Sequence, residues 1–238
     1  GAVDAAYGAA GVVVTSDFAD EDPLADDCSF AAGGAVICAR AVVGEDRLEL
    51  PRYGTAGEAL GSQDVALDYT TFASVVPPEA SVSIGAQVLD VESTPSGAVV
   101  AQRVATFWSI GDATFEGDAD LVVSRVGASG FDGAFGSGGH RVLDLEIGGA
   151  SGLTTGDGST GLLAADLALA SDGASTVQVD VADFVDQRSG VVRLTASGSL
   201  DGASAGGGLW AVTLPAGQPV AVRSFGLRAD GSGTVGGS

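Results

Sequence analysis

The sequence predicts an all-β protein: a β-sandwich or jelly-roll-like fold of about a dozen short, mostly antiparallel strands. Two observations lead to this prediction. Apolar residues recur at every second position along much of the chain, which is the period of a strand with one buried face. Turn signals separate these runs, chiefly Asp-Gly pairs such as Asp132-Gly133 and Asp172-Gly173, which suit tight hairpin turns.

The alternation predicts individual strands in chain order. It is clearest in four runs, whose apolar faces are Val82/Ile84/Ala86/Val88, Leu143/Leu145/Ile147, Val177/Val179/Val181 and Trp210/Val212/Leu214. Similar runs occupy residues 35–43, 65–72, 100–110, 121–126, 163–169, 191–196 and 219–227. The glycine-rich stretch 127–140 predicts an exposed loop. We expect residues 17–238 to form a single β-rich domain, with a possible boundary between two halves near Pro77-Pro78.

The composition is strongly acidic and limits the partners of the chain. The 238 residues carry 31 acidic and ten basic side chains, for a net charge of −21. Such a surface repels nucleic acid and anionic lipid, so neither is an expected partner. No apolar run approaches the ~18 residues of a membrane helix, so membrane insertion is not expected either.

The two cysteines indicate an oxidising compartment. Cys28 and Cys38 flank a segment with Gly33-Gly34 near its middle, and a hairpin there would bring them within disulfide reach. The alternative is two buried free thiols. The sequence starts without Met, and no basic residue precedes Arg40. We therefore expect an extracellular or cell-surface protein that is secreted and loses its leader.

An acidic cluster precedes Cys28 and is a candidate cation site. Its members are Asp17, Asp20, Asp22, Asp26 and Asp27, and Ca²⁺ takes several such oxygens. The alternative is a solvated acidic loop, since the spacing does not match an EF-hand. A weaker cluster comprises Asp112, Glu116, Asp118 and Asp120. The sequence indicates no definite cofactor, and Ca²⁺ is the one candidate.

Catalytic signatures are weak. The "GASAG" stretch at Gly202–Gly206 matches a nucleophile elbow, but a strand-like run follows it and the single histidine, His140, precedes it. The "GSGTVG" stretch at Gly231–Gly236 lacks the following helix that a phosphate site needs. We expect His140 to have a surface or structural role, and we do not expect an enzyme.

The N-terminal run is nearly uncharged in an otherwise acidic chain. Its candidate assembly residues are Val3, Tyr7, Val12, Val13 and Val14. Three consecutive valines place apolar side chains on both faces of a strand, which then needs cover on both faces. Residues 1–16 could therefore donate a strand to the next subunit. The alternative is a central strand within their own subunit.

The sequence favours a structural role. We expect a non-enzymatic subunit of a secreted homopolymer, such as a filament, tubular appendage, sheath or surface layer, assembled by β-strand contacts between subunits. The alternative is a secreted Ca²⁺- or carbohydrate-binding β-sandwich module of a surface adhesin. Trp108 and Trp210 lie on alternating runs, which favours core packing over a sugar platform.

Overall fold

The computed structural model describes residues 26–31, 33–72, 76–111, 113–147, 153–155, 161–182, 187–212, 222–227 and 233–237. In these ranges the regular structure is β-strand apart from three short 3-10 helices, and none of the helices is long and apolar enough to cross a membrane. The strand pairs are antiparallel with one exception. The all-β prediction is confirmed.

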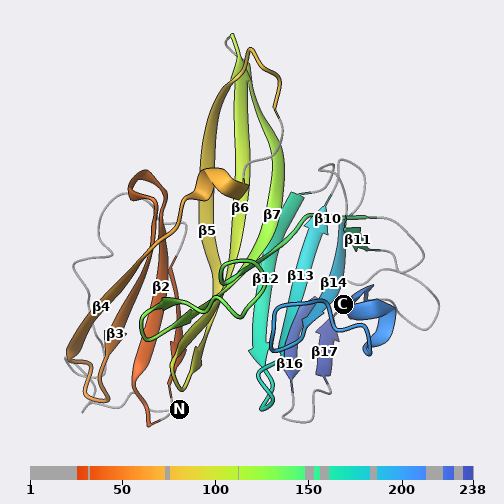
Figure 1. Ribbon diagram of the computed structural model, residues 1–238. Helices are drawn as coiled ribbons and strands as arrows, with labels where there is room; N and C mark the ends of the chain where they lie inside the picture. The colour runs from red at the N-terminus through yellow and green to blue at the C-terminus, as the bar shows by residue number, and fades with distance from the viewer. Residues whose placement is uncertain are drawn as a thin grey trace.

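Three layers of strands lie against one another. Figure 1 shows them side by side, with β5, β6 and β7 in the middle and their upper ends projecting beyond both neighbours. The first layer is a four-stranded sheet in the order β1-β2-β3-β4. Its strands are β1 (Asp26–Phe30), β2 (Val36–Val42), β3 (Arg47–Tyr53) and β4 (Ala59–Ala66).

The second and third layers belong to one sheet that folds back on itself. The second layer holds β5 (Ser81–Thr94), β6 (Gly97–Ile110), β7 (Ala113–Gly127), β8 (Gly130–Phe131) and β9 (His140–Leu143). The third layer holds β12 (Gly161–Leu169), β13 (Ser175–Ala182), β14 (Gln187–Leu194) and β15 (Leu209–Ala211). A single parallel pairing, Ala119 with Gly161, joins β7 to β12.

Short elements complete the described chain. The 3-10 helices are η2 (Val43–Glu45), η3 (Tyr69–Phe72) and η4 (Ala205–Gly208). Two small antiparallel pairs are β10 (Leu145–Glu146) with β11 (Thr154–Thr155), and β16 (Val222–Leu227) with β17 (Gly233–Gly237).

Two hydrophobic cores lie on opposite sides of the second layer. On β6, Val100 and Val104 face the first layer, while Val99 and Ala105 face the third. On β7, Val122 faces the first layer and Leu121 faces the third. Apolar residues of both parities are therefore buried, as in a strand covered on both faces. The second layer is the central layer of a sandwich-like fold.

Three details of the predicted strands differ from the structure. Residues 65–72 do not form one strand, because β4 ends at Ala66 and Asp68 accepts hydrogen bonds from the Thr70 backbone and hydroxyl, which starts η3. The run beginning at residue 209 was expected to bury Trp210. Leu209 is the buried residue instead, and Trp210 is only half-buried. The strands β5, β6 and β7 run for 14, 14 and 15 residues and are not short.

The glycine-rich stretch 127–140 is only partly the exposed loop that its composition predicted. Phe135 at its centre is fully buried in the core between the second and third layers. The guanidinium of Arg125 lies 4.8 Å from the centre of the Phe135 ring. Phe135 thus anchors this loop against the body of the protein.

Candidate functional site

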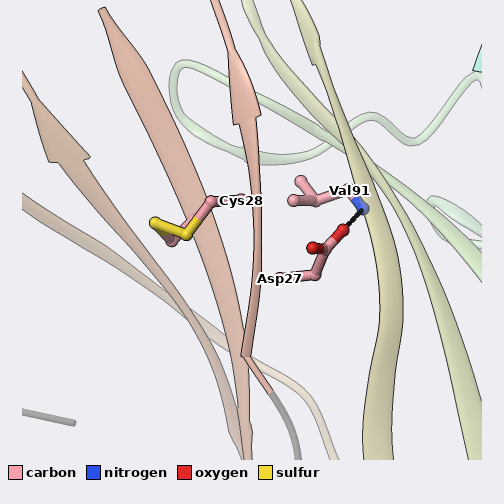
Figure 2. Close-up of a disulfide and its surroundings, with 4 residues drawn as sticks. Asp27, Cys28 and Val91 are labelled. Atoms are coloured by element: carbon pink, nitrogen blue, oxygen red, sulfur yellow. Dashed lines mark hydrogen bonds between the residues drawn. A yellow bond between two sulfur atoms is a disulfide. The ribbon is translucent and has the colours of Figure 1, made fainter. Parts of the chain in front are cut away.

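The predicted disulfide is present and joins the first two strands. Cys28 on β1 and Cys38 on β2 face each other in the antiparallel register, with their Cα atoms 4.0 Å apart. Figure 2 shows the bridge beside Asp27, whose side chain points toward β5. The bridge therefore ties the edge strand β1 to β2, directly next to the point where β1 meets the second layer.

Carboxylates connect the edge strands of all three layers. Val91 N on β5 donates to Asp27 Oδ2 at 3.2 Å and to Asp90 Oδ1 at 2.7 Å. Leu167 N on β12 donates to the other oxygen of Asp90. The pairing of β5 with β6 shifts by one residue between Val88 and Asp90, and such a bulge redirects the side chains beside it. Side chains here take the place of a strand ladder, and we call this contact the carboxylate seam.

Two further contacts hold β1 along β5. Ser29 Oγ donates to Glu92 Oε2 at 3.1 Å, and Ser93 Oγ donates to the carbonyl of Phe30 at 3.0 Å. The contacts advance in the same direction along both strands, so β1 and β5 lie parallel and are joined by side chains.

The pKa values of three carboxyl groups at the seam, those of Asp90, Glu92 and Asp166, are raised. Burial, followed by the hydrogen bond with Asp27, raises the pKa of Asp90 to about 8. Burial raises the pKa of Glu92 and of Asp166, and the charge of Asp27 adds to both effects. Asp180 also raises the pKa of Asp166. Because the raised pKa of Asp90 favours its protonated form, the seam joins the layers best when Asp90 is protonated.

The predicted Ca²⁺ site is only partly covered by the described residues. Asp27 lies in the seam, whereas Asp17, Asp20, Asp22 and the side chain of Asp26 fall outside what the structure describes. Among the described side chains, no three or more His, Cys, Asp or Glu residues are grouped so as to hold a metal ion. Calcium binding stays a prediction.

A buried polar chain crosses the core between the first two layers. Tyr69 Oη donates to Gln102 Oε1 at 3.1 Å, Gln102 Nε2 lies 3.4 Å from Ser124 Oγ, and Ser124 Oγ lies 2.9 Å from His140 Nδ1. Gln102, Ser124 and Tyr69 are fully buried. The rings of Phe72 and Phe131 contact His140 edge-on, and burial lowers its pKa. Because the Ser124 hydroxyl is fully enclosed, this chain specifies packing in the folded state.

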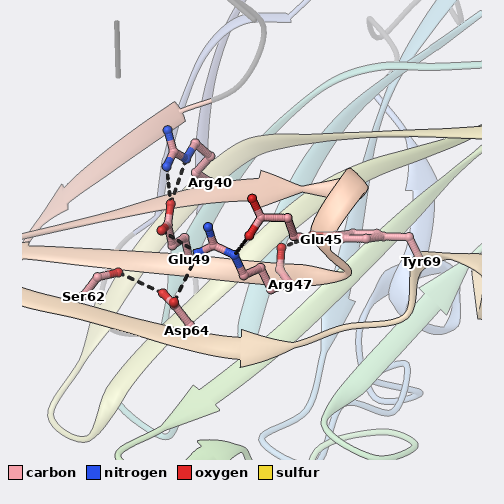
Figure 3. Close-up of polar contacts among 7 residues, drawn as sticks. All are labelled: Arg40, Glu45, Arg47, Glu49, Ser62, Asp64 and Tyr69. Atoms are coloured by element: carbon pink, nitrogen blue, oxygen red, sulfur yellow. Dashed lines mark hydrogen bonds and ion pairs between the residues drawn. The ribbon is translucent and has the colours of Figure 1, made fainter. Parts of the chain in front are cut away.

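The outer face of the first layer carries an ion-pair network, shown in Figure 3. Arg47 contacts Glu45 at 2.9 Å, Glu49 at 2.5 Å and Asp64 at 3.2 Å, and Arg40 pairs with Glu49 from the neighbouring strand. Burial alone would raise the pKa of Glu49, but hydrogen bonds from Arg47 and Arg40 hold it below its ordinary value. The network balances the charge of β3 and β4 in a chain that is otherwise strongly negative.

The strand β4 leaves one edge of the first layer open. It pairs with β3 on one side, and no strand in the described ranges pairs with its other side. Six of its eight residues are exposed, and Leu60 is 61% exposed. Nothing in the sequence alone marked this strand as an edge, because residues 59–64 carry no strong alternation. The open edge offers unpaired backbone groups to another strand.

The predicted assembly residues Val3, Tyr7, Val12, Val13 and Val14 lie outside the described residues. Comparison with known proteins adds no relative: no protein-family model, curated protein or solved structure matches the chain.

Proposed function

We propose that this chain is a non-enzymatic structural subunit of a secreted extracellular homopolymer, assembled by β-strand contacts between subunits. The observation that carries the proposal is the open edge of β4. A strand at a solvated edge normally carries a lysine, a proline or an inward-pointing charge that blocks pairing with another chain. β4 has a bulge at Leu60, but the stretch from Ser62 to Ala66 pairs regularly with β3, and its only charge is Asp64, which already pairs with Arg47.

The charge balance supports self-association at this edge. The strands β3 and β4 together hold two arginines, Arg47 and Arg52, and two carboxylates, Glu49 and Asp64. The whole chain has a net charge of −21, so two copies repel each other over most of their surfaces. The β3–β4 edge is a locally neutral place where they can meet.

The disulfide supports a secreted location, since such bridges persist in oxidising compartments. It also holds the edge strand β1 covalently to β2, so that a pulling force cannot separate these two strands, which suits a subunit of a polymer under tension. Extracellular assembly remains a proposal on these grounds.

The test is the state of the purified full-length chain. We expect it to form polymers that negative-stain electron microscopy shows and that sedimentation separates from monomer. Because salt screens the repulsion between acidic subunits, assembly should be faster in 1 M NaCl than in 10 mM NaCl. A chain that stays monomeric at all salt and protein concentrations would refute the proposal.

A further inference from the structure

Hydrogen bonds at both sides show how the first layer lies on the second. At one side β1 lies along β5 through the contact of Asp27 with Val91. At the other side Gln63 on β4 donates to the carbonyl of Gly127, the last residue of β7, at 2.9 Å. The next strand of the second layer beyond β7 is β9, which pairs with residues 121–124 of β7. In the described chain the first layer has no strand at the corresponding position, beyond β4.

The side chain of Val142 on β9 is exposed where the first layer ends. Val142 is the register partner of Val122 and therefore points to the same face of the second layer. Val122 is fully buried in the core between the first two layers, whereas Val142 is 39% exposed. The two valines differ in position because Val122 lies under the first layer and Val142 lies just past its end. On the same face of β9, Phe72 of η3 already contacts His140, so the part of this face left uncovered is the end that carries Val142.

The register shows which backbone groups of β4 point outward. The Cα distance of 4.0 Å between Cys28 and Cys38 is that of a non-hydrogen-bonded pair, so the backbone groups of Cys38 point to β3. Continuing the register from Ile37↔Arg52 places Pro51 on β3 opposite Cys38. The pairing is interrupted there and resumes at Arg40↔Glu49, because proline has no N–H to donate.

This fixes the direction of the backbone groups on β4. The carbonyl of Pro51 points to β2, so its partner on β4, Ser62, points its own N–H and C=O away from β3. With a period of two, Asp64 and Ala66 do the same. Three consecutive outward positions are thus ready to pair with an added strand.

We infer that the first layer is completed by residues 1–16 of a second copy, which pair with β4 and lie over β9. This inference rests on the proposed function and identifies the surfaces that meet between two subunits. The run from Ala5 to Ser16 carries no charge, so it can lie beside Asp64 without repulsion. Its consecutive valines, Val12, Val13 and Val14, need apolar cover, and Val142 provides it on the inner face. A second β4 strand would instead bring two Asp64 carboxylates close together.

Cross-linking tests the contact directly. The chain has only the two cysteines of its disulfide, so an introduced thiol is unique. Val13→Cys and Ser62→Cys are made in separate chains, mixed and oxidised gently, and the products are mapped by peptide mass. We expect a covalent Val13–Ser62 heterodimer only in the mixture. Ala203→Cys, at an exposed position of the turn before η4, replaces Ser62→Cys as the matched control and should give at least tenfold less product.

Two results would overturn the inference. One is equal cross-linking of Val13→Cys to both partners. The other is a Ser62→Cys homodimer that forms in preference to the heterodimer, which would show β4 pairing with β4.

A backbone variant separates this inference from the proposed function. Ser62→Pro removes one outward N–H, whereas Ser62→Ala loses the same hydroxyl but keeps the N–H. Both should keep the far-ultraviolet circular dichroism of the wild type, because proline is tolerated at a strand edge. We expect Ser62→Pro to lose most of its sedimenting polymer and Ser62→Ala to retain it.

The outcomes are distinct. Normal polymerisation of Ser62→Pro refutes the β4 contact and leaves the polymer intact. A wild type that never polymerises refutes the proposed function, and the cross-linking result then still decides whether residues 1–16 meet β4.

Discussion

Asp27 on β1 and Asp90 on β5 accept hydrogen bonds from the same backbone N–H, that of Val91, at 3.2 and 2.7 Å. The two residues are far apart in the sequence and belong to different layers. Burial and the neighbouring Asp27 raise the pKa of Asp90 at the join between the first two layers, so the stability of the fold should depend on pH.

Asp27→Asn should flatten this dependence. The pKa of Asp90 is raised from 3.8 to about 8, so the folded state holds a proton that the unfolded state has released, and wild-type stability falls as the pH rises between these values. An asparagine at position 27 can accept from Val91 and donate to ionised Asp90. We expect the variant to be more stable than the wild type at pH 8 by about 1 kcal/mol after allowance for solvent screening, measured by urea unfolding.

The control for this prediction is Glu79→Gln, which removes one negative charge at an exposed turn. It should leave the slope of stability against pH unchanged. Parallel slopes for Asp27→Asn and the wild type between pH 4 and 8 would show that Asp27 does not raise the pKa of Asp90.

His140 should make the folded state less stable as the pH falls, whereas Asp90 makes it less stable as the pH rises. Burial lowers the pKa of His140 from 6.5, so the unfolded state binds the proton more readily and stability is lost as the pH falls through 6.5. His140→Gln can keep a contact with Ser124 and does not titrate. The difference in unfolding free energy between wild type and variant should shift in favour of the variant between pH 7 and 5. An NMR titration of the single histidine that gives a pKa above 6.5 would rule this out.

The disulfide should stabilise β1 locally. Replacing both cysteines, Cys28→Ser with Cys38→Ser, opens a loop with a sequence separation of 10 and should cost about 2–3 kcal/mol in the chain-entropy model. Hydrogen exchange should rise first in residues 26–30, which form an edge strand. Intact mass with and without reductant checks the bridge in the native protein, and two thiols that react with an alkylating agent before reduction would refute it.

Gly190 on β14 should tolerate no side chain. A Cβ there would lie 1.6 Å from Leu153 Cδ1, and Leu153 is fully buried in the core between the second and third layers. Gly190→Ala should therefore destabilise the protein by about 1–3 kcal/mol in thermal unfolding. Gly202→Ala is the matched control, because its Cβ would meet nothing within 4 Å. Similar melting temperatures for the two variants would mean that Leu153 does not pack on Gly190.

Much of the local structure could be predicted from the sequence. The alternation of Val177, Val179 and Val181 correctly identified a core-facing strand, and Gly33-Gly34 between the cysteines correctly indicated a hairpin closed by a disulfide. Such features depend on residues close together in the chain. The run at 100–110 was predicted to have one buried face, whereas residues 98–101 are all fully buried because layers cover both faces of β6.

The layers and the site were decided by tertiary structure. A period of two tells which residues share a face, but it does not tell which strand lies against that face or where a sheet ends. The exposure of Val142 follows from the end of the first layer at β4, and the raised pKa of Asp90 follows from Asp27 lying beside it. His140 is half-buried because η3 and β8 bring Phe72 and Phe131 against it. Each of these depends on contacts between distant segments, which only the packing of the three layers creates.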